Sequence, residues 1–192
     1  PPFAAPTSTV YTKGIYVAGT TGLAITGNTL RSIVSYVATP TNAIELVSAI
    51  GTGGVNISNN TITGVACNTT NIGQAIAVAS SASNPVISGN TISNIQSVGN
   101  GSASMAAITV THTGTGGTIS NNTITNLRGR TTNGWGCFGI NITGGNAWTV
   151  QNNFVSDVNS FLANAGLSTT FGPFGIRLAG GLNHKVYHNS VH

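Results

Sequence analysis

The hexapeptide ISNNTI occupies residues 57–62 and returns unchanged at 119–124. Close variants stand at 25–30 (ITGNTL), 87–92 (ISGNTI), 150–155 (VQNNFV) and 186–191 (VYHNSV). All six copies have asparagine in the fourth position, and successive asparagines are 30 to 36 residues apart. A period of this size is typical of stacked-repeat proteins, in which each repeat buries its apolar face against its neighbours. The phrase therefore predicts a solenoid.

A second phrase recurs in step with the first and alternates apolar and variable residues. Its copies are GIYVA (14–18), AIELV (43–47), AIAVA (75–79), AITVT (107–111), GINIT (139–143) and GIRLA (175–179). The isoleucine of each copy and the residue two positions later fall on one face of a strand. We expect one strand from this phrase, and two short strands joined by a tight turn from the asparagine phrase.

Three short strands and one longer loop per period predict an all-β fold. Helices are disfavoured because β-branched residues fill the apolar positions, while Gly, Asn, Ser and Thr interrupt every helical turn. A leucine-rich repeat would need a leucine spacing that is absent, and a propeller blade would need a longer period with antiparallel hairpins. We therefore predict a right-handed parallel β-helix of five to six coils with three short strands per coil.

In such a fold, equivalent residues of successive coils lie above one another at about 4.8 Å. The recurring asparagines should then form a ladder of amides that hydrogen-bond from coil to coil, each asparagine taking the left-handed conformation of the tight turn. The ladder residues are Asn28, Asn60, Asn90, Asn122, Asn153 and Asn189. Because neighbouring coils shield these positions, we predict a structural role for them.

The composition limits the possible partners. Only 4% of the 192 residues are charged, so the polar surface must consist of Ser, Thr, Asn and Gly. Six basic residues against Glu45 and Asp157 give a net charge of +4. Since the basic residues are spread along the chain, we expect no nucleic-acid partner. No run of 18 apolar residues occurs, so we expect no membrane insertion.

Residues 1–192 are expected to be a single β-helix segment of a longer polypeptide. The sequence begins at Pro1 without methionine and stops at His192 inside a repeat, which would leave a bare sheet edge. The rest of that polypeptide would be the first partner of the segment.

No residues are predicted to be catalytic. Acid/base cleavage of a glycosidic bond needs two carboxylates within roughly 10 Å. Glu45 and Asp157 should lie three coils apart, about 14 Å, on different faces. A calcium-dependent lyase would need several clustered carboxylates. We therefore expect no enzyme activity and no cofactor.

No metal site is predicted either. Cys67 and Cys137 are expected in loops two coils apart, about 10 Å, which is beyond disulfide reach unless the loops bend, and they form no CxxC pair. His184, His188 and His192 are spaced by four, but in an extended segment this spacing separates side chains by roughly 13 Å. We expect them to be exposed histidines of the final coil.

Two surface features remain. The third strands of three consecutive coils predict an array of hydroxyls and methyls, interrupted by Arg31 below and Phe154 above. The strands carry Thr61-Ile62-Thr63, Thr91-Ile92-Ser93 and Thr123-Ile124-Thr125. The second feature is the pair of irregular loops at 128–138 and 159–174, which could gather on one side and carry recognition. Their candidate patch for a glycan or a partner protein comprises Arg128, Arg130, Trp135, Phe161, Phe171 and Phe174. The alternative is that these aromatics cover the core of the coil.

With these residues in view, the chain resembles the parallel β-helix repeats of large secreted and surface proteins of bacteria. The ending GLNHKVYHNSVH (181–192) is similar to coil endings of Bacteroidota proteins, many of which are type IX secretion system cargo and serve as adhesins or surface fibres. The threonine array resembles the ice-binding faces of β-helical antifreeze proteins, and the pectin-degrading enzymes share the scaffold but contribute no matching motif.

The resemblance implies a non-catalytic stalk or adhesive fibre of a secreted or cell-surface protein, whose partners are surface glycans or attachment proteins. The alternative from the residues is a carbohydrate-binding module that uses the 128–138 and 159–174 loops. Ice binding and polysaccharide degradation are the weaker candidates.

Overall fold

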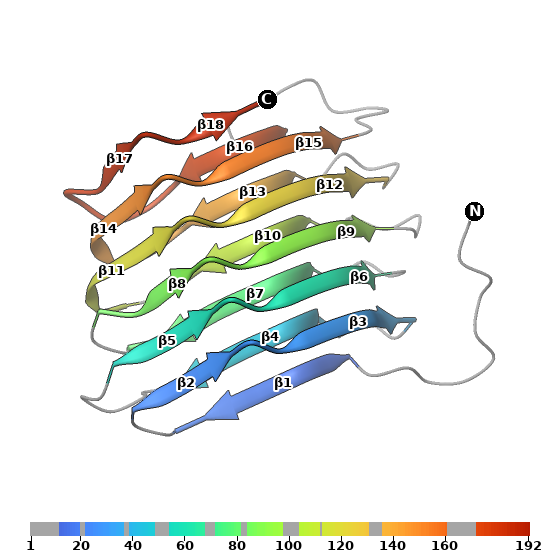
Figure 1. The fold of residues 1–192 in the computed structure, drawn as a ribbon, viewed down its shortest axis with the longest axis horizontal. Helices are drawn as coiled ribbons and strands as arrows, with labels where there is room; N and C mark the ends of the chain where they lie inside the picture. The colour runs from blue at the N-terminus through green and yellow to red at the C-terminus, as the bar shows by residue number, and fades with distance from the viewer. Residues whose placement is uncertain are drawn as a thin grey trace.

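The computed structural model describes residues 12–19, 22–36, 39–48, 54–67, 72–81, 84–97, 104–111, 113–130, 136–160 and 172–192. These residues form three parallel sheets of six strands each. In Figure 1 the chain rises from β1 to β18, running from left to right along the front strands and returning from right to left behind them, which is a right-handed winding. The predicted right-handed parallel β-helix is confirmed.

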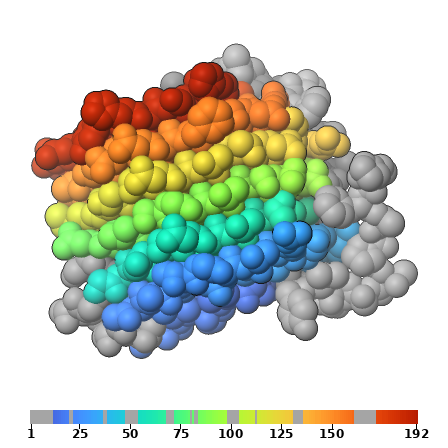
Figure 2. All heavy atoms as spheres, viewed as in Figure 1, coloured from blue at the N-terminus to red at the C-terminus, as the bar shows by residue number. Residues whose placement is uncertain are grey.

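Every coil contributes one strand to each sheet. Sheet A contains β1 (Lys13–Ala18), β4 (Thr41–Ser48), β7 (Gly73–Ser80), β10 (Met105–Val110), β13 (Cys137–Ile142) and β16 (Pro173–Leu178). Sheet B contains β2 (Leu23–Thr26), β5 (Val55–Ser58), β8 (Val86–Ser88), β11 (Thr115–Ser120), β14 (Asn146–Gln151) and β17 (Lys185–Tyr187). Sheet C contains β3 (Thr29–Ser35), β6 (Thr61–Cys67), β9 (Thr91–Ser97), β12 (Thr123–Gly129), β15 (Phe154–Ser160) and β18 (Ser190–Val191). Figure 2 shows the coils as successive bands across the face that carries sheets B and C.

The core consists of like residues stacked in register. Ile44, Ile76, Ile108 and Ile140 of sheet A follow one another in the strand pairing, and none of them is exposed. Burial of one such side chain contributes about 1.5–3 kcal/mol. The equivalent Ile176 of the last coil is only partly buried, because β16 has a described neighbour on one side alone. Stacking of neighbours therefore produces the burial, as in other solenoids.

The asparagine ladder occupies the corner between sheets B and C, and Asn90 shows its pattern. Its Oδ1 accepts hydrogen bonds from the backbone N–H of Asn60 (3.0 Å) and from Asn60 Nδ2 (3.0 Å). Its own Nδ2 donates to Asn122 Oδ1 (2.9 Å) and to the carbonyl oxygen of Ile57 (2.9 Å). The same bonds link each of the six ladder asparagines to the next. The predicted ladder is therefore confirmed.

One detail of the ladder prediction is wrong. The left-handed residue of the turn is the one that precedes each ladder asparagine, not the ladder asparagine itself. The left-handed positions are Gly27, Asn59, Gly89, Asn121, Asn152 and His188, with φ between 55° and 68°. Because the turn reverses the side chain that follows it, the ladder amide points inward, where Asn60, Asn90 and Asn122 are each 1% exposed. Glycine and asparagine fill most turn positions because they adopt positive φ at low cost.

The largest buried side chain needs a glycine in the coil beneath it. Trp148 of β14 is fully buried and pairs in register with Gly117 of β11, which has φ +152°. A Cβ atom on Gly117 would lie 2.5 Å from the indole ring. This distance is far below a normal carbon contact of 3.5–4.0 Å. The bulky indole is thus accommodated only because the residue under it has no side chain.

Candidate functional site

Both acidic residues of the chain form ion pairs with a basic residue of an adjacent strand. Glu45 of β4 pairs with Lys13 of β1 in sheet A, and Asp157 of β15 pairs with Arg128 of β12 in sheet C. The prediction that the two carboxylates lie on different faces is confirmed. The net charge of +4 therefore rests on the cations outside these pairs, which are Arg31, Arg130, Arg177 and Lys185.

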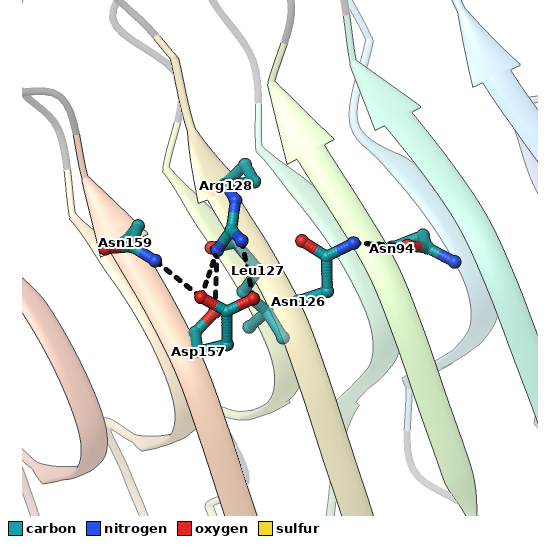
Figure 3. A network of polar contacts seen from close by, with 6 residues as sticks. All are labelled: Asn94, Asn126, Leu127, Arg128, Asp157 and Asn159. Carbon is teal, nitrogen blue, oxygen red and sulfur yellow. Dashed lines mark hydrogen bonds and ion pairs between the residues drawn. The ribbon is translucent and has the colours of Figure 1, made fainter. Parts of the chain in front are cut away.

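The Arg128–Asp157 pair is bidentate (Figure 3). Arg128 Nη1 lies 2.8 Å from Asp157 Oδ1, Nη2 lies 2.5 Å from Oδ2, and Nη1 also donates to the Asp157 carbonyl oxygen at 3.0 Å. A fourth hydrogen bond to Asp157 comes from Asn159 Nδ2, which donates to Oδ1 at 2.8 Å. The hydrogen bonds from Arg128 hold the pKa of Asp157 below its usual value. Much of the charge of Arg128 is thereby taken up within the protein.

Asp157 ends a column on the outer face of sheet C in which each backbone is left-handed. The column comprises Ser32, Gly64, Asn94, Asn126 and Asp157, with φ between 56° and 75°. Asn126 Nδ2 donates to Asn94 Oδ1, and Asn94 Nδ2 donates to Thr63 Oγ1 at 3.0 Å. We call these five residues the outer column. Its conformation works like a bulge, because the strand buries residues three apart, such as Ile92 and Ile95, on either side of it.

A groove of about 510 Å³ runs along the outer column across β3, β6, β9 and β12. Its lining includes Arg31, Asn94, Gln96, Asn126, Arg128 and Arg130. Since β3 and β12 are three strands apart in sheet C, Arg31 lies about 14 Å along the axis from the other two arginines. The groove is therefore a polar channel with cations at both ends.

The groove corrects the expectation that the basic residues are dispersed. They are distant in the sequence, but three of the six line this one groove. Sequence reasoning treated Arg31 only as an interruption of the threonine array and missed its grouping with Arg128 and Arg130. Alignment of the repeats in register could have found it, because all three follow the ladder asparagine within the third strand or directly after it.

Of the six residues in the candidate patch, the structure describes Arg128, Arg130 and Phe174. Arg128 and Arg130 lie at the groove of sheet C, whereas Phe174 of β16 lies in sheet A and stacks on Phe138 with ring centroids 5.9 Å apart. Trp135, Phe161 and Phe171 lie outside the described residues. The described contacts therefore do not bring Phe174 together with the two arginines.

Sheet A carries a smaller depression of about 230 Å³ beside Phe138. Arg177 lies over the ring of Phe138, 5.3 Å from its centroid, and donates to Asn141 Oδ1 at 3.1 Å. Thr109, also in the lining, is 5% exposed, and its hydroxyl has no hydrogen-bond partner in the described part of the chain. Phe138 is itself 5% exposed, so its ring offers little surface to a ligand.

The threonine array is present and interrupted as predicted. Thr61, Thr91 and Thr123 are in register, with Phe154 as the next partner of Thr123 and Arg31 as the partner of Thr63. Ser93 Oγ donates to Thr63 Oγ1 at 3.1 Å, so some hydroxyls are already bonded within the array. A 40% exposed phenylalanine at one end and an exposed arginine at the other limit the flat area.

The cysteines and histidines differ from expectation in their position. Cys67 ends β6 and Cys137 begins β13, so both lie in strands rather than loops, and no disulfide joins them. Burial raises the pKa of the Cys137 thiol to about 12. His184 is half-buried rather than exposed, since Nδ1 accepts from the Trp148 backbone N–H (3.3 Å) and Nε2 bonds the Gly180 carbonyl oxygen (2.8 Å). His188 and His192 are exposed as predicted.

Across the described ranges, no three His, Cys, Asp or Glu side chains gather as they would around a metal ion. In the same residues no helix has the length and apolarity of a membrane span. Comparisons with protein-family models, with curated proteins and with solved structures found no match to this chain. The solenoid fold thus rests on the strand pairing described above, and the sheet C groove is the candidate functional site.

Proposed function

We propose that the chain is a rigid, non-catalytic segment of a secreted or cell-surface bacterial protein, acting as a stalk or adhesive fibre. The observation that carries the proposal is the asparagine ladder, which runs without interruption through six coils. A buried amide column of this length adds nothing to a ligand site, but it connects every coil to the next.

Axial stiffness follows from the direction of the hydrogen bonds. In each sheet the backbone bonds run from strand to strand, and therefore along the solenoid axis. Bending or stretching the axis would have to break the bonds of three sheets and of the ladder together. A spacer that keeps its length under load needs this property.

The location outside the cell is supported by the resemblance of the repeats and of the 181–192 ending to Bacteroidota surface proteins. Export by the type IX secretion system is part of the same proposal. A chain in which only 4% of the residues are charged, and which is rich in Asn, Ser, Thr and Gly, suits an extended fibre with a mostly uncharged surface.

Single-molecule pulling on the chain, attached by its two ends, tests the spacer role. We expect the wild-type chain to keep its length up to a force at which Asn90→Ala already lengthens in steps of one or more coils. Asn28→Ala, at the half-buried end of the ladder, serves as the matched control and should behave like wild type. Continuous extension of the wild-type chain at low force would refute a stalk.

Catalysis is tested separately with polygalacturonate and alginate. We expect no new reducing ends and no unsaturated products after prolonged incubation. Product formation that is lost in Glu45→Gln or Asp157→Asn would show that the chain is an enzyme and assign the acid. Product formation that survives both substitutions would refute the non-catalytic proposal and point to other residues.

A second candidate function is glycan recognition by the 128–138 and 159–174 loops. The position of Arg128 and Arg130 at a groove favours it. On a glycan array, saturable binding that is lost in Trp135→Ala would support this function. Absence of binding, or binding unchanged in Trp135→Ala, would argue against recognition by these loops and leave the stalk as the remaining candidate function.

A further inference from the structure

The geometry points to the sheet C groove as a binding site for a linear acidic polysaccharide, laid along the solenoid axis across β3, β6, β9 and β12. This inference does not depend on the spacer role, and of the loops at 128–138 and 159–174 it uses only Arg128 and Arg130. It is based on the unpaired charge of the groove, its hydrogen-bonding side chains and its direction.

The charge of the groove is not neutralised from within the protein. The only two carboxylates of the sequence are held by Lys13 and Arg128, so Arg31 and Arg130 have no acidic partner. Both side chains are exposed. A guanidinium presents a planar fork of donors that matches a carboxylate or a sulfate. Two such forks about 14 Å apart along the axis fit a polymer with repeated negative charges better than a single small anion.

The wall between the arginines offers hydrogen bonds. Gln96 lines the groove with its amide, and Asn126 uses one amide hydrogen on Asn94. Their remaining donors and acceptors can pair with sugar hydroxyls, which both donate and accept. Asn94 and Asn126 occupy equivalent positions of successive coils, so the groove repeats an amide along the axis as a polysaccharide repeats its hydroxyls.

Other anionic polymers fit the groove less well. Single-stranded nucleic acids are held by aromatic platforms on which the bases stack, and no aromatic residue is among the described lining. Membrane surfaces are bound by clusters of basic residues beside apolar anchors. This groove has two uncompensated cations and polar walls.

Asp157 reduces the positive charge that the groove can offer to a ligand. Its carboxylate accepts hydrogen bonds from both Nη atoms of Arg128 at the end of the groove. The two preceding residues of the outer column are asparagines with the same left-handed backbone. Asp157→Asn should therefore keep the backbone conformation, release Arg128 and add one net positive charge. It should increase affinity, which is a sharper test than loss of binding.

The binding test uses three polysaccharides that have the same dextran chain and differ in charge. We would measure binding of the purified full chain to unmodified dextran, carboxymethyl dextran and dextran sulfate by interferometry, at about 50 mM and 500 mM salt. Binding to a charged form, weakened at the higher salt, is expected. Preference for the carboxymethyl or the sulfated form identifies the anion, whereas binding to neither, or equal binding to neutral dextran, would overturn the inference.

The variants assign the binding to the groove. Arg31→Gln and Arg130→Gln should each weaken binding about fivefold, and Asp157→Asn should tighten it about threefold. Lys185→Gln removes the same charge from exposed β17 in sheet B and should change affinity less than twofold. Circular dichroism and thermal melting check that every variant is folded.

Two results would contradict the proposed site. If Lys185→Gln weakened binding as much as Arg31→Gln, the polysaccharide would be attracted by the net charge of the protein alone. Tighter binding of a single-stranded oligonucleotide than of either charged dextran would mean that the groove serves nucleic acid. Neither result would affect the spacer proposal, which depends on stiffness and not on binding.

Discussion

The inner ladder and the outer column both stack asparagine side chains from coil to coil, but only the inner ladder is asparagine throughout. Inside, Asn60, Asn90 and Asn122 are 1% exposed, and each amide has partners above and below. Outside, the equivalent positions change from Ser32 to Gly64 and on to Asp157. A buried position requires the amide, because a missing partner leaves polar groups without water. An exposed left-handed position requires only a permissive backbone.

The largest difference should appear when an inner amide is removed. Asn90→Ala removes the Asn90 amide that bonds the Asn60 backbone N–H and the Ile57 carbonyl oxygen in the core. It also removes one of the two acceptors of Asn60 Nδ2, which keeps the Ile25 carbonyl oxygen. We expect a loss of roughly 3 to 6 kcal/mol in the free energy of unfolding, measured by urea denaturation. Asn28→Ala orphans fewer groups at the ladder end and should cost about 1 kcal/mol. Equal losses in the two variants would contradict the explanation that a buried amide is required because its loss leaves polar groups without partners.

Replacing a glycine by alanine should also destabilise the protein more in the core than in the outer column. Gly117→Ala places its Cβ 2.5 Å from Trp148, at a φ of +152°, and should cost about 3 kcal/mol. Gly64→Ala in the outer column meets its nearest neighbour, the Ser32 backbone nitrogen, at 3.4 Å, and should cost only the left-handed strain of about 1–2 kcal/mol. Thermal melting of the two variants gives the comparison, and a milder effect at Gly117 would show that the core around the indole can relax.

A pair of substitutions at one position of the outer column, the half-buried Asn126, tests whether conformation or hydrogen bonding matters there. Asn126→Ala should lose about 1 kcal/mol, because alanine is strained at φ 56° and the bond to Asn94 is lost. Asn126→Gly should recover most of this loss, because glycine adopts positive φ freely. If glycine is no better than alanine in urea denaturation, the amide bond and not the backbone dominates in the outer column.

The smallest effect concerns pH. The pKa of Asp157 is lowered in the folded state by Arg128, so the ion pair stabilises the fold above the unfolded pKa of about 4. That stabilisation is lost as the pH falls through the lowered pKa. The Tm difference between wild type and Asp157→Asn should therefore favour wild type more at pH 7 than at pH 2.5. A difference independent of pH, measured by scanning calorimetry, would mean that the pair contributes nothing to stability.

The sequence predicted the architecture because the patterns that define a β-helix are local and repeated. Six alternating isoleucine phrases and six asparagine phrases indicated the three strands and the turn of each coil. It misplaced the left-handed residue by one position, because asparagine occupies both the turn and the ladder in ISNNTI. Cys67 and Cys137 were assigned to loops because the ends of strands are not marked by any pattern, and both are strand termini.

The candidate site was harder to predict for a different reason. Arg31 and Arg130 are far apart in the sequence, and neither belongs to a repeated phrase. Their common groove depends on the register between β3 and β12, to which every coil between them contributes. The aromatic and basic patch, by contrast, was inferred from the tendency of long loops to gather on one side of a solenoid, and it stays a prediction because Trp135, Phe161 and Phe171 lie outside the described residues.

By itself, the amino-acid sequence determined the period, the strand type and the buried asparagine column, because hydrophobic alternation and a recurrent amide act within one coil and between adjacent coils. Only the tertiary structure decided which charges are neutralised and which remain. Coil stacking places Arg128 beside Asp157 and leaves Arg31 and Arg130 without an acid. Such pairing depends on distances of a few ångströms between coils, and no local pattern encodes them.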